Sequence, residues 1–189
     1  MNVDIRREDV RSMRAYASIP SSFDVRAVVD VEAMRLGEST VPTRAIGSQW
    51  VKSYDAIPGN DPVSWATRYD VRSWIHLAAY VDTSRVGGAI VVTDPASVAE
   101  LGGGAGGAVL WDLRVAPSSR RRGIGRTLLA AAEDAARFAG CSMLDVETQD
   151  INVAACRLYG DNGYVLTAVS PDAYSDAPGE TRLLWSKRL

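Results

Sequence analysis

The sequence is poor in the residues that build metal sites and disulfide frameworks, with one histidine and two cysteines among 189 residues. Cys141 and Cys156 do not form a metal-ligand spacing and cannot make a disulfide network, so both are predicted to be small buried hydrophobic residues. His76 lies in an apolar segment with no cysteine or acidic residue beside it, which is typical of a structural histidine. We therefore expect no metal site.

Long hydrophobic runs and an excess of positive charge are also missing. The longest apolar stretches, such as residues 90–92 and 128–132, are far shorter than the roughly 20 residues that span a bilayer. The N-terminal residues carry charge from the fourth position onward and do not read as a secretory signal, so we expect a cytoplasmic protein without a membrane partner. The net charge of -2 argues against nucleic acid as the main partner.

The composition that is present is that of an ordinary globular protein. Hydrophobic residues make up 47% and charged residues 23%, which are close to the averages for soluble folded proteins. The length suits one domain with a substantial core, so residues 1–189 are predicted to form a single domain.

The first hundred residues predict short elements. We expect a strand at 3–5, a helical turn or two at 7–16, a strand at 22–31, and an antiparallel hairpin of strands 73–81 and 86–93 joined by residues 82–85. The segment from Trp50 to Tyr54 is predicted to end an element and run into an acidic loop that is a candidate substrate rim. The glycine-rich residues 102–107 lack the lysine of a phosphate loop and are interpreted as a flexible hairpin connection.

The second half has clearer patterns. Residues 108–115 predict a buried strand, and Ile124, Leu128, Ala131, Ala135 and Phe138 recur on one face of a helix that Gly140 closes. Further elements are a strand at 143–148, a short helix from Asn152 to near Gly163, and strands at 164–169 and 182–187. The order predicts a mixed α/β fold whose sheet is antiparallel early and contains one parallel crossover.

The segment from Arg120 to Arg126 has the chemistry of an anion site. Gly123 and Gly125 let the backbone approach a ligand, and the helix that begins there presents unpaired N–H groups and the positive end of its dipole. Four arginines add charge suited to a pyrophosphate or a nucleotide phosphate: Arg120, Arg121, Arg122 and Arg126. A glycine-containing turn with a solvated basic face is the alternative. A dinucleotide fingerprint is not matched, because Leu128 stands where a third glycine or alanine is needed.

Together with the preceding strand, this segment resembles the GNAT superfamily of N-acetyltransferases, whose core pattern is Arg/Gln-x-x-Gly-x-Gly/Ala. Arg120, Gly123 and Gly125 occupy those positions, and the resemblance covers about residues 109–164. More scattered residues resemble the streptothricin acetyltransferase branch: residues 50–54, the run from Glu147 through Asn152, Ala155 and Tyr159 to Tyr164, and the ending that contains Glu180, Trp185 and Arg188.

The resemblance implies an α/β fold of the α+β type, with a mostly antiparallel sheet, flanking helices and a central βα motif that binds acetyl-CoA and releases coenzyme A. The backbone of Leu113 and Val115 would pair with the pantetheine arm, and Arg114 between them would also contact the cofactor. The amides of residues 123–126, from Gly123 through Ile124 and Gly125 to Arg126, would hold the pyrophosphate. Asn152, Ala155 and Tyr159 would also contact the cofactor.

Acyl transfer to an amine needs a neutral nucleophile, a polarised carbonyl and a proton for the leaving thiolate. Tyr159 is the candidate acid. An amide at Leu113 or Val115 is the candidate donor to the thioester oxygen. Asp112 and Glu147 are candidate bases, although each can instead be a solvated strand residue or an arginine partner, and amines can also lose a proton to water.

The acceptor pocket is predicted to be lined by Trp50, Tyr54, Asp55, Asp145 and Glu147, and the rim acids, with Asp61 and Asp150, suit a cationic molecule. We therefore expect an acetyltransferase for a primary amine of a small cationic molecule, most specifically the β-lysine amine of streptothricin, which would make it an antibiotic-resistance enzyme. The alternatives are a protein or peptide N-acetyltransferase and a non-catalytic acyl-CoA sensor. A homodimer is plausible, because exposed strand edges often pair between subunits.

Overall fold

The computed structural model describes residues 2–35, 41–100, 103–171, 173–174 and 177–189. The chain divides into two compact units. The first comprises Met1–Ser22, Ser53–Asp145 and Arg188–Leu189, and the second comprises Phe23–Lys52 and Val146–Lys187. Within the described ranges, the helices fall short of the length and apolar character that a bilayer crossing requires.

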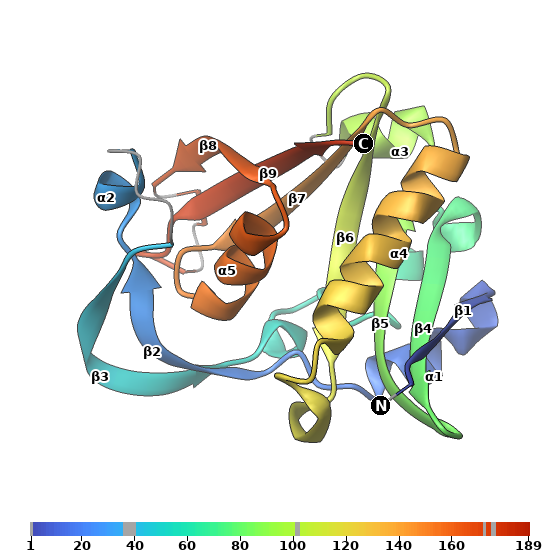
Figure 1. The fold of residues 1–189 in the computed structure, drawn as a ribbon, viewed down its shortest axis with the longest axis horizontal. Helices are drawn as coiled ribbons and strands as arrows, with labels where there is room; N and C mark the ends of the chain where they lie inside the picture. The colour runs from blue at the N-terminus through green and yellow to red at the C-terminus, as the bar shows by residue number, and fades with distance from the viewer. Residues whose placement is uncertain (1, 36–40, 101–102, 172, 175–176) are drawn as a thin grey trace. The chain divides into compact units, whose positions relative to one another are not determined.

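The first unit is built on a sheet in the order β1-β4-β5-β6-β7 (Figure 1). Its strands are β1 (Asp4–Glu8), β4 (Ile75–Val81), β5 (Ser84–Val92), β6 (Gly107–Val115) and the start of β7 (Met143–Gln149). Pairing is antiparallel from β1 to β6, and β6 pairs with β7 in parallel. The predicted mixed sheet with one parallel crossover is thus confirmed.

Short helical segments complete the first unit. They are η1 (Val10–Ser12), α1 (Met13–Ala17), η2 (Tyr54–Ala56), η3 (Trp65–Thr67), η4 (Val71–Ser73), α3 (Pro95–Glu100) and η5 (Pro117–Ser119). The sequence did not predict α3, and the hairpin connection of β4 and β5 is two residues long, where four were expected. Residue 102 of the predicted glycine-rich connection lies outside the described ranges, and β6 begins at the last glycine, Gly107.

The long helix α4 (Ile124–Phe138) covers one face of β4, β5 and β6 (Figure 1). Its buried face follows a spacing of four residues through Ile124, Leu128, Ala132 and Ala136. The predicted face was correct at its start and wrong at its end, because Phe138 is 90% exposed in the last turn. Gly140 closes the helix with φ of +84°, as expected.

An aromatic cluster forms the core on the other side of this unit. Trp65, Trp74 and Trp111 contact one another with ring centroids 5.6–6.2 Å apart, and Tyr16 and Tyr69 join them. Trp65 and Trp74 are buried. Trp111 is the extra residue of a β-bulge, because Ile90 and Val91 on β5 pair with residues 112 and 110 of β6.

Gly88 lets the first helix pack directly on the sheet. A Cβ atom at this position would lie 2.7 Å from the carbonyl oxygen of Leu77 and 2.7 Å from the Tyr16 ring. We expect Gly88→Ala to lower the free energy of unfolding by about 1–3 kcal/mol, as overpacking does in dense cores. Urea unfolding followed by tryptophan fluorescence would measure it. The control is Gly47→Ala, where a Cβ meets nothing within 4 Å; equal stability of the two variants would contradict this packing account.

His76 makes folding sensitive to acid. It is 2% exposed on β4, and burial lowers its pKa below the usual 6.5 although Asp9 and Glu8 oppose this. The unfolded chain therefore takes up a proton near pH 6.5 that the folded chain resists, so stability falls as the pH drops below that value, by up to about 1.4 kcal/mol per pH unit. Because the chain has one histidine, unfolding of the parent and of His76→Leu between about pH 8 and about pH 5.5 isolates this effect. If the unfolding free energies of the two proteins fall in parallel with pH, His76 does not cause the acid sensitivity.

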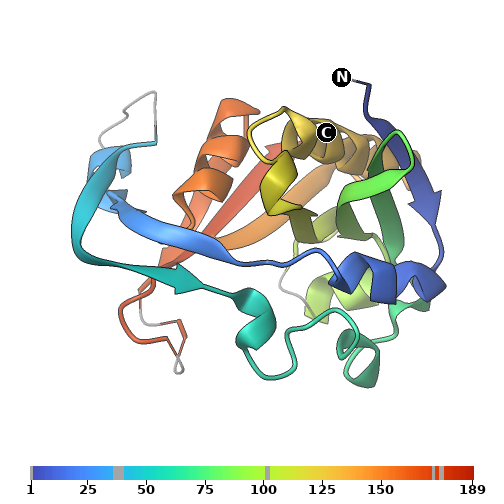
Figure 2. The ribbon, with the colours of Figure 1, turned by 90° about the horizontal axis from the view of Figure 1, so that it is seen from below.

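The second unit contains a two-stranded antiparallel sheet and the C-terminal strands. β2 (Phe23–Val29) pairs with β3 (Thr43–Lys52) as a long ribbon (Figure 2), and the other strands have the order β7-β9-β8. β8 (Val165–Ser170) and β9 (Arg182–Arg188) are antiparallel, and the helices are α2 (Val31–Arg35) and α5 (Val153–Asp161). The predicted strands here are confirmed, whereas α2 was not foreseen.

The core of the second unit gathers Val25, Val28 and Ile151. Trp185 is also buried, as is Cys156, whose burial was predicted and raises the pKa of its thiol to about 12. The prediction of burial was wrong for Cys141, in the first unit, which is half-buried.

Candidate functional site

The end of strand β6 presents backbone groups on one edge. Ala116 donates its N–H to Val86 of β5. Since successive strand residues point their N–H and C=O groups to alternate edges, those of Val115 and Leu113 face the edge on which β7 pairs. Consistent with this, the Val115 oxygen accepts a hydrogen bond of 2.9 Å from Nε of Arg120, in the loop after the strand. Both predicted pantetheine contacts thus lie on one edge of β6.

The loop after β6 turns sharply into α4. Arg121 and Gly123 have φ of +59° and +83°, in the left-handed region. Gly123 is the N-cap and offers no side chain to the amides of the first turn, whereas its own oxygen accepts from Thr127. A Cβ at Gly123 would meet nothing within 4 Å, so the position requires glycine for its backbone conformation.

The predicted anion-binding residues are therefore brought together at the start of α4. Buried Ile124 anchors the first turn, and the side chains of Arg121, Arg122 and Arg126 are exposed around it. Gly125 lies in the first turn, where backbone amides have no helical partner. Free amides at a helix N-terminus with exposed arginines around them suit an anion, and phosphate binding here stays a prediction.

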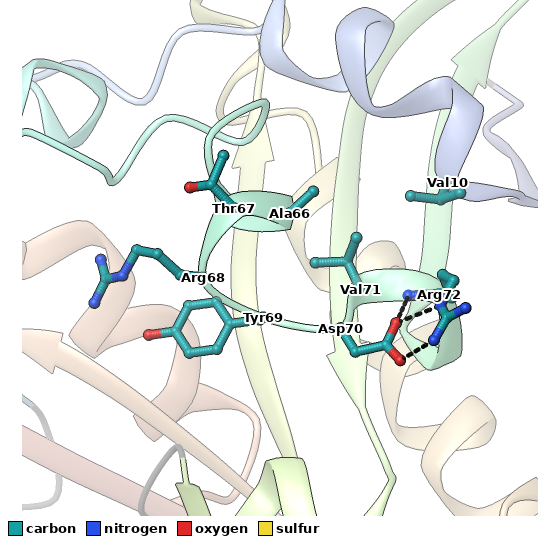
Figure 3. A pocket seen from close by; sticks show the side chains of 8 residues that line it. All are labelled: Val10, Ala66, Thr67, Arg68, Tyr69, Asp70, Val71 and Arg72. Atoms are coloured by element: carbon teal, nitrogen blue, oxygen red, sulfur yellow. Dashed lines mark hydrogen bonds and ion pairs between the residues drawn. The ribbon is translucent and has the colours of Figure 1, made fainter.

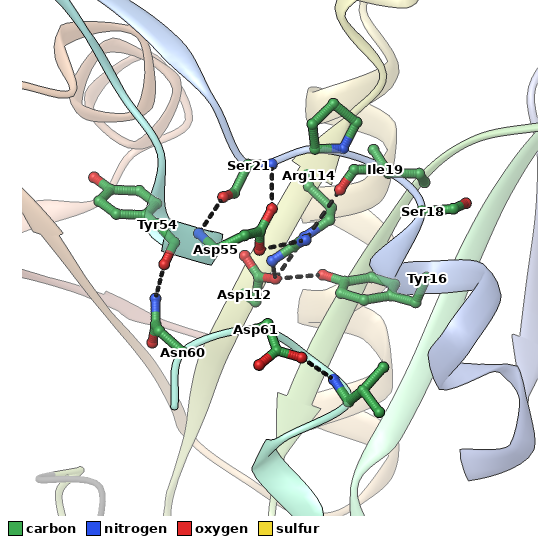
Figure 4. Close-up of polar contacts among 12 residues, drawn as sticks. Tyr16, Ser18, Ile19, Ser21, Tyr54, Asp55, Asn60, Asp61, Asp112 and Arg114 are labelled. Atoms are coloured by element: carbon green, nitrogen blue, oxygen red, sulfur yellow. Dashed lines mark hydrogen bonds and ion pairs between the residues drawn. The ribbon is translucent and has the colours of Figure 1, made fainter. Parts of the chain in front are cut away.

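The Arg114 side chain is the centre of a hydrogen-bonded network that its place in the strand did not indicate (Figure 4). Its guanidinium, 3% exposed, forms an ion pair of 2.5 Å with Asp112, donates 3.0 Å to the Ile19 carbonyl and pairs with Asp55 at 3.1 Å. The Tyr16 hydroxyl donates to the same Asp112 oxygen at 3.0 Å. The cofactor contact predicted for Arg114 stays a prediction, with the side chain engaged in this network.

The network shifts the titration of its members. Burial opposes the charge of Arg114, but Asp112, Tyr16 and Asp55 outweigh it and raise its pKa. Burial also raises the pKa of Asp112, against the pull of Arg114, and raises the pKa of the Tyr16 hydroxyl well above 10. The candidate base Asp112 thus serves as the partner of an arginine and a tyrosine, which is the alternative weighed for it from the sequence; its role as a base stays a prediction.

Three predicted acceptor residues lie in the first unit. Asp55 sits in η2 beside Tyr54, and its second oxygen accepts from the Ser21 amide at 2.9 Å. Asp145, on β7, is 7% exposed and accepts from the Gly104 amide at 3.2 Å. Both carboxylates therefore accept hydrogen bonds within the first unit, and their contact with an acceptor stays a prediction.

The helix α5 holds the motif residues of the second unit. Asn152 is the N-cap of α5, and its side-chain oxygen accepts from the Ala155 amide at 3.2 Å. Tyr159 is 6% exposed, with its ring centroid 5.7 Å from Tyr164 and 6.4 Å from Trp185. The predicted helix start is confirmed, and the ring of the candidate acid is fixed by aromatic packing.

Glu147 lies on β7 with its side chain 49% exposed. It accepts a hydrogen bond of 2.8 Å from the Tyr174 hydroxyl and lies 3.9 Å from Arg182. Trp50, on β3, is 43% exposed, which leaves ring surface for a ligand. Glu147 is thus the more accessible of the two candidate bases.

Two motifs assigned to the streptothricin branch meet in the second unit. Lys52 ends β3, Glu180 precedes β9, and the ammonium contacts both carboxylate oxygens at 2.7 and 2.9 Å. The side chains are 14% and 13% exposed. This ion pair joins residues that are 128 positions apart in the sequence.

A separate open pocket of about 580 Å³ lies over η3 and η4 (Figure 3). It is lined by Val10 and residues 66–72. Asp70 and Arg72 pair at its rim, and Arg72 lowers the pKa of Asp70 to about 2. None of the predicted site residues lines it.

The chain belongs to the GNAT acetyltransferase family. The family described as Acetyltransferase (GNAT) matches residues 45–164, which is more than half of the chain and includes parts of both units. The predicted family and fold class are thereby confirmed.

One curated relative is streptothricin acetyltransferase A of Bacillus subtilis (strain 168). It is 35% identical over 82 residues, which cover 42% of this chain and 47% of the relative. The match therefore spans less than half of the relative's length.

Solved structures share the fold over the whole chain. Nourseothricin acetyltransferase has a TM-score of 0.74 at 21% identity, covering 100% of this chain and 99% of its own. A Bacillus anthracis str. Ames protein, proposed to be a streptothricin acetyltransferase and crystallised with acetyl coenzyme A, has a TM-score of 0.72 at 20% identity, with both chains covered fully. The ribosomal-protein-S18-alanine N-acetyltransferase of Escherichia coli has a TM-score of 0.63 at 17% identity, covering 99% of this chain and 94% of its own.

Sequence reasoning missed the side-chain network around Arg114. One local signal existed, because Asp112 and Arg114 are two residues apart on a strand and so share a face, where opposite charges among buried neighbours indicate an ion pair. Nothing near them in sequence points to Ile19 or Asp55.

Proposed function

We propose that this chain is an acetyl-CoA-dependent N-acetyltransferase that acts on a primary amine of a small cationic molecule, with the β-lysine amine of streptothricin as its acceptor. Family membership supports the reaction class. The observation that carries the proposal is the left-handed turn at Arg121 and Gly123, which opens the amides of α4 beside the exposed edge groups of β6.

Acetyl-CoA supplies an activated acetyl group as a thioester. In the first unit, Leu113 and Val115 offer N–H and C=O groups along one strand edge, which suits the amides of the pantetheine arm. The first-turn amides of α4 suit the pyrophosphate, and the exposed Arg121, Arg122 and Arg126 suit the remaining phosphate charge. From the family pattern we further propose that Asn152, Ala155 and Tyr159 contact the same cofactor.

In the proposed reaction the neutral amine attacks the thioester carbonyl, a C–N bond forms and the C–S bond breaks. A β6 amide stabilises the developing oxyanion, a contact type worth about 3 kcal/mol in known sites. Tyr159 gives its proton to the leaving thiolate. Glu147, with its exposed carboxylate, takes the proton that the amine loses, directly or through water.

The acceptor assignment rests on the partial likeness to streptothricin acetyltransferase A and on acidic residues. Glu147 is exposed on β7, and Trp50 offers ring surface on β3. A carboxylate and an aromatic ring are groups that bind ammonium ions. Resistance to streptothricin would follow from loss of the amine's positive charge.

Release of coenzyme A, followed with a thiol reagent, tests the acceptor. Purified protein and acetyl-CoA would be mixed separately with streptothricin, aminoglycosides, polyamines and lysine-bearing peptides. We expect turnover on streptothricin well above that on the others. Turnover on peptides instead would establish the protein N-acetyltransferase alternative, and acetyl-CoA binding without release on any acceptor would favour the sensor alternative.

A further inference from the structure

We propose that Arg114 and Asp55 form a positioning pair, which holds the turn η2 with its predicted acceptor residue Tyr54 at a fixed place against the cofactor strand β6. The proposal rests on the proposed function, because it assigns η2 to the acceptor side of the same site. The proposal also gives the N-terminal segment a structural role, because residues 19–21 complete the link between η2 and β6.

The Arg114 side chain is positioned to link separate segments of the first unit rather than to bind a ligand. Its backbone lies in β6, and its side chain is 3% exposed, with donors directed at Asp112, Asp55 and the Ile19 carbonyl (Figure 4). The planar guanidinium fixes these directions together, which a lysine ammonium does not do. The partners come from three separate stretches of the chain: the strand itself, η2 and the segment after α1.

The segment after α1 is tied to the same two elements. Ser21 and Asp55 exchange hydrogen bonds, the Ser21 amide to the Asp55 carboxylate and the Asp55 amide to the Ser21 hydroxyl, both at 2.9 Å. Ile19 accepts from Arg114, and Pro20 accepts from Arg120 of the proposed phosphate loop at 3.4 Å. Residues 19–21 therefore bridge β6, the phosphate loop and η2.

The turn is then fixed to the next loop through Tyr54. Its carbonyl accepts from the Asn60 side chain at 3.1 Å and from the Ile57 amide at 3.1 Å. Asp55 is the residue of η2 that reaches β6 through an ion pair. Buried ion pairs are often no more stabilising than apolar residues would be, so specification of geometry is the use that best fits this one.

The test compares Asp55→Ala with a matched control, Asp70→Ala. Both aspartates accept from an arginine side chain and a backbone amide, but Asp70 pairs with Arg72, two residues away on the exposed surface. Kinetics would use streptothricin and acetyl-CoA, with acetyl-CoA affinity measured separately by calorimetry. We expect Asp55→Ala to lower kcat/KM for streptothricin by about 10- to 100-fold, chiefly through KM, with acetyl-CoA affinity within about twofold and Asp70→Ala unchanged.

Amide hydrogen exchange provides a readout that needs no acceptor. Asp55→Ala should speed exchange at Ser21 and at residues 55–57, whereas Asp70→Ala should speed it near Arg72 only. Absence of turnover in the parent protein would count against the proposed function, and the exchange comparison would then decide the positioning claim by itself.

Arg114→Lys gives a second variant that keeps the charge beside Asp112. We expect it to reproduce the KM effect of Asp55→Ala, and the double variant to be little worse than either single one, because both remove the same link. Three results would overturn the proposal. They are additive losses of kcat/KM in the double variant, equal weakening of acetyl-CoA binding and acceptor binding, or unchanged amide hydrogen exchange in Asp55→Ala.

Discussion

Tyr159→Phe should lower the rate of acetyl transfer by about 10²–10⁴-fold, the usual contribution of a positioned general acid, and leave acetyl-CoA affinity unchanged. The substitution removes one hydroxyl from a ring that is 6% exposed and packed by Tyr164 and Trp185. The ring contacts persist in Phe, so the fold should persist as well. Single-turnover measurements with acetyl-CoA and acceptor separate the chemical step from binding.

Tyr164→Phe is the matched control. Tyr164 is 4% exposed and its ring is the neighbour of Tyr159, so the two substitutions remove the same group from the same aromatic packing. We expect near-normal turnover in the control. Equal losses in both variants would indicate a packing effect, and full activity in Tyr159→Phe would remove this residue from the mechanism.

Gly123→Ala should raise the dissociation constant of acetyl-CoA by roughly 5- to 30-fold. Gly123 has φ of +83°, a conformation that costs an alanine about 1–2 kcal/mol, and an energy of that size corresponds to a factor of roughly 5–30. Relief of the strain would turn the first-turn amides of α4 away from the pyrophosphate. Calorimetry with acetyl-CoA and with coenzyme A measures the change.

Gly140→Ala supplies a control at the opposite end of the same helix. Gly140 has φ of +84°, and at both glycines a Cβ would meet nothing within 4 Å. The two variants should therefore lose similar unfolding free energy, while Gly123→Ala alone loses affinity. Equal affinity in both would argue against pyrophosphate binding at this helix start.

The second half of the fold could be predicted from the sequence because its signals are local. The strand β6, the helix α4 and the N-cap Asn152 follow from apolar periodicity, glycines at helix ends and a side chain that caps. The end of α4 was assigned to the wrong face at Phe138, since a run of alanines allows several buried faces and packing against β4, β5 and β6 selects one.

The first half was harder for a physical reason. Its elements are short, and α2 and α3 span five and six residues, too few for periodicity to distinguish a helix. The turn η2 was expected as an irregular loop for the same reason.

The site was predictable where backbone chemistry defines it and not where distant side chains meet. Glycines and arginines next to one another in sequence indicated the turn at the start of α4, and its binding of phosphate stays a prediction. Arg114 and Asp55 are 59 positions apart, and Lys52 and Glu180 are 128 apart, so no local pattern indicates either pair. Asp55 and Asp145, which were predicted to line the acceptor pocket, accept hydrogen bonds within the first unit from residues that are distant in sequence.

The most direct test of acetyl transfer is mass spectrometry of the acceptor after incubation with the purified chain, acetyl-CoA and streptothricin, with thiol release measured in the same samples. The account predicts one added acetyl group on the acceptor for each coenzyme A released, located on the β-lysine amine. Coenzyme A release without an acetylated acceptor would contradict the account. Tight acetyl-CoA binding with no coenzyme A release and no acetylated acceptor would contradict it as well.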